Sequence, residues 1–256
     1  MKLAAIFLTA ATVLASAAYA AGPTVIAHRG LWQAPGSAQN SIRSLLLADS
    51  IGSDASEFDV WRTKDGLIIV NHDKTINGVD IESCTSDVVL AQKLENGENV
   101  PTLEEYLAAA KPLKTRLILE IKAHNHNSNE RAAIKETVAL VKKYGLEDRT
   151  EYVTFSKNGI LLLRDELGPE VPVHYPGGDY IPAQLKSMGD ISLYYKITVL
   201  KKHPEWIREA HSLGIPVGVW TINTPEEMQW CIDNKVDFVT SNIPEKSMQM
   251  IKTQTK

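Results

Sequence analysis

The feature of this 256-residue sequence that most limits its fold is a regular alternation of β-rich runs with amphipathic stretches. Strands are predicted at 24–30, 55–63, 67–73, 115–123, 151–156, 171–178, 190–197, 215–223 and 236–244. Helical spacing of apolar residues falls between several of them, at 40–52, 101–111, 129–145 and 224–234. Strand then helix, repeated to about eight strands, favours an α/β fold of the (β/α)₈ TIM-barrel type. The alternative is an open doubly wound sheet, but no dinucleotide-binding fingerprint follows the first strand.

One segment interrupts this alternation. Residues 74–100 are polar and poorly periodic, and they follow the predicted strand LIIVNHD at 67–73. We interpret them as a small insertion within a single domain that spans 21–256. The regular pattern resumes at Pro101, where Thr102 and Glu105 form the sequence signature of a helix capping box.

The first twenty residues, MKLAAIFLTAATVLASAAYA, have a basic flank, an apolar core and a small-residue end. This pattern predicts a secretory signal peptide over 1–20 that is cut after Ala20. The mature protein is then exported, to the periplasm in a Gram-negative bacterium and otherwise to the medium. No basic stop-transfer flank follows and no cysteine stands at the cut, so a stable membrane anchor is not expected.

The remaining composition excludes one class of partner and weakens the case for a disulfide. A formal net charge of −4 without a basic stripe argues against nucleic-acid binding. The two cysteines, Cys84 and Cys231, lie far apart in the sequence, and we interpret them as small buried apolar residues. The sequence leaves the oligomeric state open.

Chemically active residues gather where predicted strands end, which is where TIM barrels carry their active sites. They are His28, Arg29, Glu57, Asp59, His72, Glu120 and Lys122. Glu57 and Asp59 are two residues apart on one strand, so both side chains leave the same face. A single histidine or carboxylate pair at such a place usually has a structural explanation. Recurrence at the same end of several strands favours a functional site.

The combination of side chains indicates chemistry on a phosphodiester. Three carboxylates at one barrel mouth repel each other unless a cation lies among them. Oxygen ligands suit one hard divalent ion, Mg²⁺ or Ca²⁺. Two histidines can serve as base and acid, and two fixed positive charges can neutralise a phosphate. Trp220 ends another predicted strand, where it either packs against substrate carbons or fills the barrel core.

The order of short motifs resembles that of the glycerophosphodiester phosphodiesterase family. The motifs are AHRG at 27–30, SEFDVWRTKDG at 56–66, NHD at 71–73, PTLEE at 101–105, LEIK at 119–122 and VWTIN at 219–223. Together they cover nearly all of the mature chain. The resemblance implies a TIM barrel with a short insertion after the NHD segment. It also implies hydrolysis of a small-molecule glycerophosphodiester to sn-glycerol 3-phosphate and an alcohol.

The resemblance also assigns roles to individual residues. It implies that Glu57, Asp59 and Glu120 hold a divalent ion, usually Mg²⁺ or Ca²⁺. His28 and His72 then act as general base and general acid, and Arg29 and Lys122 contact the phosphate. The implied mechanism uses the substrate's own hydroxyl, beside the phosphate, as the first nucleophile. A cyclic phosphate forms and water opens it.

Two positions depart from the family pattern, and two other functions compete. Gln39 stands where members usually have glutamate, and Asn242 where many have aspartate. Loss of these charges is expected to affect ion binding or the preferred alcohol. One competing function is hydrolysis of lysophospholipids or other bulky phosphodiesters, although the insertion is mostly polar. The other is an exported phosphodiester-binding protein without catalysis, although every implied catalytic residue is present.

Overall fold

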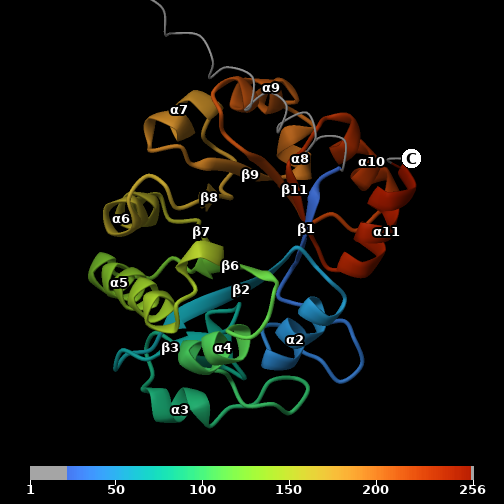
Figure 1. Ribbon diagram of the computed structural model, residues 1–256. Coiled ribbons are helices and arrows are strands. Elements are labelled where there is room, and N and C mark those ends of the chain that lie inside the picture. The colour runs from blue at the N-terminus through green and yellow to red at the C-terminus, as the bar shows by residue number, and fades with distance from the viewer. Residues whose placement is uncertain (1–21, 255–256) are drawn as a thin grey trace, which may run out of the picture.

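A closed barrel of eight parallel strands forms the centre of the computed structural model, which describes residues 22–254 (Figure 1). The barrel strands are β1 (Thr24–Ala27), β2 (Ala55–Arg62), β6 (Arg116–Ile121), β7 (Thr150–Val153), β8 (Val173–Tyr175), β9 (Ser192–Lys196), β10 (Val217–Trp220) and β11 (Phe238–Ser241). Each pairs in parallel with its neighbours, and β1 pairs with both β11 and β2, which closes the ring. The predicted TIM barrel is confirmed.

Helices surround the barrel on all sides (Figure 1). They are α2 (Ile42–Ser50), α4 (Leu103–Ala110), α5 (Asn127–Tyr144), α6 (Lys157–Leu167), α7 (Pro182–Ser187), α8 (Ile197–Leu200), α9 (Glu205–Ser212), α10 (Pro225–Asp233) and α11 (Pro244–Gln254), with a 3₁₀ turn at Glu147–Arg149. Local sequence explains several of their ends. Thr102 and Glu105 form the predicted capping box of α4, and Gly145 ends α5 in the left-handed conformation.

Successive side chains along each barrel strand point to opposite faces, and this alternation separates two apolar layers. Side chains that point outward, such as Phe58, Leu119 and Val219, belong to the large core between strands and helices. Side chains on the opposite face fill the barrel itself, and they are Ile26, Ala55, Ile118, Val153 and Tyr194. Glu57 and Glu120 lie two residues beyond Ala55 and Ile118, so strand geometry places them on this inner face.

The run at 67–73 is not one of the eight barrel strands. Its ordered part, β3 (Ile68–Val70), pairs antiparallel with the last residues of β2, with Val70 opposite Val60. After β2 has passed the rim, β3 therefore runs back toward the mouth. His72 reaches the mouth by this return, and not because it follows a parallel strand.

The segment 74–100 contains a two-stranded hairpin, β4 (Thr75–Ile76) and β5 (Val79–Asp80), followed by α3 (Ser86–Leu90). It has an apolar cluster separate from the barrel core, formed by Trp61, Ile69, Ile76, Ile81, Val89 and Val100. Because Trp61 and Ile69 come from β2 and β3, this cluster attaches the segment to the hairpin that carries His72.

Three further expectations concern the chain as a whole. The proposed signal peptide at 1–20 lies outside the described residues. In the described part of the chain, Cys84 and Cys231 are free thiols; Cys231 is buried as expected, but Cys84 is only half-buried. None of the described helices has the length and apolar character of a membrane span.

Close contact between two barrel strands predicts a sensitive position at Gly218. It lies beside Phe238 on β11, and a Cβ at residue 218 would overlap the Phe238 ring. We expect Gly218→Ala to lower the free energy of unfolding by about 1–3 kcal/mol, as over-packed cores do. Urea unfolding measures this change. The double variant Gly218→Ala, Phe238→Leu should recover part of the loss, whereas strictly additive effects would contradict the proposed clash.

Candidate active site

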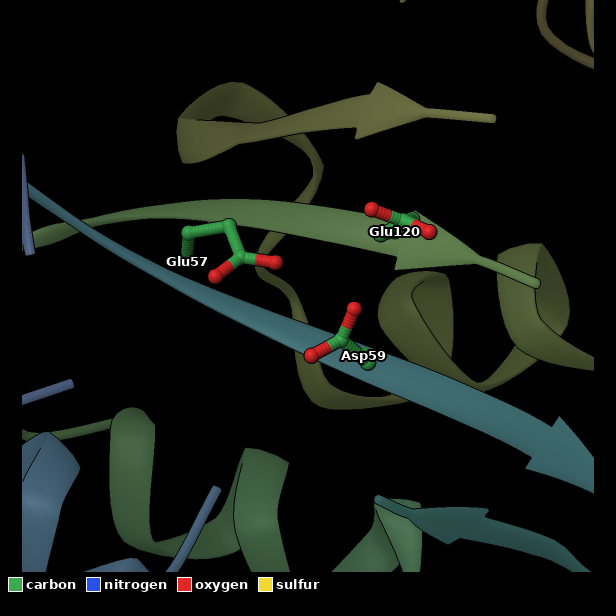
Figure 2. Close-up of side chains that lie close together, drawn as sticks. All are labelled: Glu57, Asp59 and Glu120. Carbon is green, nitrogen blue, oxygen red and sulfur yellow. The ribbon is translucent and has the colours of Figure 1, made fainter. Parts of the chain in front are cut away.

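Three carboxylates from two adjacent strands meet inside the barrel mouth (Figure 2). Asp59 on β2 lies in register with Glu120 on β6, and Glu57 precedes Asp59 by two residues on the same face. Oxygen atoms from all three lie within 4.8 Å of one another. The side chains are almost fully enclosed, since Glu57, Asp59 and Glu120 are 4%, 0% and 8% exposed. The sequence-predicted metal ligands are therefore close together.

One lysine contacts this group but does not neutralise all of its negative charge. Lys122 Nζ lies 2.6 Å from Asp59 Oδ1 and 2.7 Å from Glu120 Oε1. Among residues 22–254, it is the basic side chain that forms ion pairs within this group, and its partners are Asp59 and Glu120 but not Glu57. Three negative charges against one positive charge leave a deficit of two when all are ionised.

This deficit appears in the protonation behaviour of the group. Burial raises the pKa of Glu57 well above its usual range, and the charges of Asp59 and Glu120 add to the effect. Burial also raises the pKa of Glu120 to about 7, although Lys122 opposes it. Burial acts in the same direction on Asp59, but Lys122 and His72 outweigh it and lower the pKa of that carboxyl. Without another cation, Glu57 therefore holds its proton more strongly than a free carboxyl does, and Glu120 loses its proton only near neutral pH.

The loop after β1 folds tightly against these acids. The backbone N–H of Arg29 donates to Glu57 Oε2 at 2.8 Å, with Arg29 in a left-handed conformation at φ 56°. The next residue, Gly30, has φ 75°, and a Cβ there would overlap Ser44 of α2. The guanidinium of Arg29 donates through Nη1 to the side-chain oxygen of Gln39. Arg29 is therefore fixed at the mouth with a neutral partner.

Asn40 is a second loop residue that holds the site, and the sequence-based set did not include it. Its side-chain Nδ2 donates to Asp59 Oδ2 at 2.9 Å, and its Oδ1 accepts from the Asp59 backbone N–H at 3.3 Å. Asn40 is 1% exposed and has φ 59°, a conformation that asparagine tolerates better than most residues. It fixes the orientation of the Asp59 carboxylate.

His28 follows β1, and its side-chain hydrogen-bond partner lies near the other end of the chain. Its Nδ1 lies 2.7 Å from Asn242 Oδ1, just after β11. Burial, followed by the charge of Arg29, lowers the pKa of His28 to about 4, while the Asn242 hydrogen bond acts in the other direction. At neutral pH the imidazole is therefore uncharged and able to accept a proton.

His72 has a carboxylate as its partner. Its Nδ1 lies 2.7 Å from Asp73 Oδ1, and Asp73 is largely exposed. Burial lowers the pKa of His72, while Asp59 and Asp73 oppose that effect. The charge of Asp59 acts on both histidines, and His72 also acts on His28. The two imidazoles and the carboxylates thus share one electrostatic environment.

Trp220 lies three strands away from β2 around the barrel, at the end of β10. Its Nε1 donates to the backbone oxygen of Tyr194 at 3.0 Å, and Phe155 packs edge-on against its ring at 5.7 Å between centroids. The ammonium of Lys196 lies 5.0 Å from the ring centroid. Trp220 therefore forms a half-buried aromatic wall and also packs against the barrel core.

A cavity of about 430 Å³ opens beside His72. One wall comes from the loop after β1, with Gln39 and Asn40, and another comes from the insertion. Its lining residues are Ala38, Gln39, Asn40, Asn71, His72, Asp73, Thr75, Ile76, Asn77, Lys93, Leu94 and Glu95. None of the three clustered carboxylates lines it, so the cavity adjoins the site on the His72 side.

The two departures from the family pattern contact site residues other than the carboxylates. Gln39 contacts Arg29 and Asn242 contacts His28, so their direct effects fall on a guanidinium and an imidazole. Together with Asn40, they are polar residues in loops that follow the C-terminal ends of β1 and β11. Their position was a visible sequence signal, but their partners depend on how the loops fold.

Comparisons with known proteins identify the family of this chain. A model of the glycerophosphoryl diester phosphodiesterase family matches residues 28–246. A glycerophosphodiester phosphodiesterase of Caldanaerobacter subterraneus is 26% identical over 251 residues, covering 89% of this chain and 97% of that protein.

Solved structures show the same fold. The crystal structure of a glycerophosphodiester phosphodiesterase from Parabacteroides distasonis has 42% identity and a TM-score of 0.89, covering 92% of this chain and 99% of that one. A phosphodiesterase of Oleispira antarctica, solved with the product sn-glycerol-3-phosphate, has 23% identity, a TM-score of 0.78 and coverages of 92% and 99%. The chain belongs to the glycerophosphoryl diester phosphodiesterase family.

Proposed function

We propose that this protein is a divalent-cation-dependent enzyme that hydrolyses glycerophosphodiesters to sn-glycerol 3-phosphate and an alcohol. The observation that carries the proposal is the convergence of Glu57, Asp59 and Glu120 beside Lys122 and two histidines. Family membership supports the reaction class. The product bound to the Oleispira antarctica phosphodiesterase supports the identity of the product.

The donor set fits a hard divalent ion. Glu57, Asp59 and Glu120 offer only oxygen atoms. When ionised, they and Lys122 have a net negative charge of two, which the charge of Mg²⁺ or Ca²⁺ would balance. Asn40 and the Arg29 backbone orient two of these carboxylates, as supporting residues of metal sites do. When bound there, the ion would supply Lewis-acid polarisation of a phosphoryl oxygen.

The two histidines have different partners, an amide for His28 and a carboxylate for His72, and these partners suit different tasks. His28, uncharged at neutral pH, takes the proton of the substrate hydroxyl adjacent to the phosphate, and that oxygen attacks phosphorus. The bond from phosphorus to the alcohol breaks as His72 gives that alcohol a proton. In the second step water opens the cyclic phosphate, with the histidine roles exchanged, and the starting protonation states return.

We infer that two positive side chains, the cavity beside His72 and the ring of Trp220 orient the substrate. Arg29 and Lys122 neutralise the phosphate as charge builds on it. The leaving alcohol occupies the cavity beside His72, since the acid must reach the oxygen that departs. The glycerol carbons then pack on Trp220 across the mouth.

The first test measures ion binding without relying on activity. Mg²⁺ or Ca²⁺ at roughly 100 times its dissociation constant should stabilise the fold by about 2.7 kcal/mol, which raises the melting temperature by several degrees. Glu57→Gln should keep the Arg29 contact, retain the melting temperature of the ion-free protein and lose the shift. Glu245→Gln, an exposed change on α11, should keep it. An equal shift in both variants would rule out the proposed site.

The second test concerns the histidines. His28→Ala and His72→Ala should each lower kcat for glycerophosphocholine by roughly 10²- to 10⁴-fold, as loss of an acid or base does. Release of sn-glycerol 3-phosphate reports the rate. His126→Ala removes an exposed imidazole before α5 and should have no effect. Turnover that persists in excess EDTA, or in His28→Ala, would contradict the mechanism.

Export is a separate part of the proposal and rests on the sequence of residues 1–20. When the full chain is expressed in a Gram-negative bacterium, the protein should appear in the periplasmic fraction and begin at Ala21. Intact mass determines the first residue. An uncleaved chain in the cytoplasmic fraction would refute it.

A further inference from the structure

We propose that Asn242 is a positioning residue that holds the proton of His28 on Nδ1 and leaves Nε2 free to receive a proton from the substrate. The inference rests on the proposed role of His28 as general base. Asn242 belongs to the loop after the last strand, β11, and is 214 residues from His28 in the sequence.

The direction of the hydrogen bond follows from the partners of the Asn242 amide. Trp32 Nε1 also faces Asn242 Oδ1, at 3.4 Å. An indole nitrogen can only donate, so the atom that it faces is the amide oxygen and not the amide nitrogen. The same oxygen lies 2.7 Å from His28 Nδ1, and an amide oxygen can only accept. His28 therefore donates from Nδ1.

Consequently, a neutral His28 presents an unprotonated Nε2. The two ring nitrogens of an imidazole have opposite roles when the ring is uncharged, and the bond made by one fixes the other. Neutral histidine in water prefers the proton on Nε2, the form that could not accept a proton through that atom. Asn242 reverses this preference and also limits rotation of the ring.

Asn242 is itself held in place independently of its side chain. Its backbone N–H donates to Asn223 Oδ1 at 3.0 Å, in the loop after β10. The last two barrel units are thus connected to the first by the chain Asn223, Asn242, His28. A substitution of the Asn242 side chain leaves the Asn223 bond intact, which allows a clean test.

His72 has a different kind of partner. Its Nδ1 faces the Asp73 carboxylate, which stabilises a protonated ring, whereas the amide at Asn242 brings no charge to His28. The charged groups that act on His28 are Arg29, Asp59 and His72, so a neutral acceptor positions the ring without adding a negative charge to it. The partner of each histidine therefore matches its proposed task, and the Asp73 carboxylate offsets part of the effect by which burial lowers the pKa of His72.

The test compares Asn242→Leu, which removes the acceptor at similar volume, with Asn242→Asp, which keeps an acceptor. The leucine variant should lose roughly 10- to 100-fold in kcat, a typical cost for a residue that orients a functional side chain, with little change in KM. The aspartate variant should keep most of the activity that leucine loses. Asn234 is the residue after α10, and its side chain donates to the Trp230 carbonyl. The control variants Asn234→Leu and Asn234→Asp should leave kcat unchanged.

Nitrogen chemical shifts of the His28 ring provide a readout that does not depend on turnover. In the natural protein at pH 7, the proton should reside on Nδ1, and in Asn242→Leu it should move to Nε2. A proton on Nε2 in the natural protein, or full kcat in Asn242→Leu, would overturn the inference. If His28→Ala is itself fully active, the proposed function fails instead, so the two failures are distinguishable.

Discussion

The crowding of three carboxylates in one enclosed space is the constraint on which the rest of the site depends. Burial strengthens their repulsion, and Lys122 offsets only part of it. The protein tolerates this arrangement because Asn40 and the Arg29 backbone donate hydrogen bonds to two of the acids. Such a local cost is expected where function requires charge, since a core built for stability alone would place apolar residues there.

The barrel keeps this charge localised. Below the mouth, Ile26, Ala55, Ile118 and Val153 form an apolar cluster inside the barrel, and Phe238 occupies the space left by Gly218. The acids therefore rest on an apolar layer that separates them from the other end of the barrel. The antiparallel strand β3 then adds His72, and the insertion attached to it forms part of the adjoining cavity. One hairpin thus connects the proposed acid to the cavity in which we propose that the leaving alcohol lies.

Placement of the histidines combines segments that are far apart in the chain. His28 follows the first strand but its partner follows the last, which is possible because β1 pairs with β11 when the barrel closes. His72 instead has its partner as the next residue. Closure of the barrel is therefore a condition for orienting His28, whereas His72 has its partner by local sequence alone.

The sequence by itself determined the fold class and the chemical content of the site. Alternating strands and helices indicate a TIM barrel, and the period of two along β2 and β6 places Glu57, Asp59 and Glu120 on one face. These features are local, so they can be derived from spacing. The antiparallel direction of β3 could not be derived, because LIIV has the same pattern in a barrel strand as in a returning hairpin.

Tertiary structure alone decided which polar residue meets which. Gln39, Asn40 and Asn242 stand in loops whose left-handed turns and close contacts set their partners, and no periodicity describes such turns. The sequence supplied the acids, bases and cations of this protein. Only closure of the ring brought the last loop to the first and placed Asn242 beside His28.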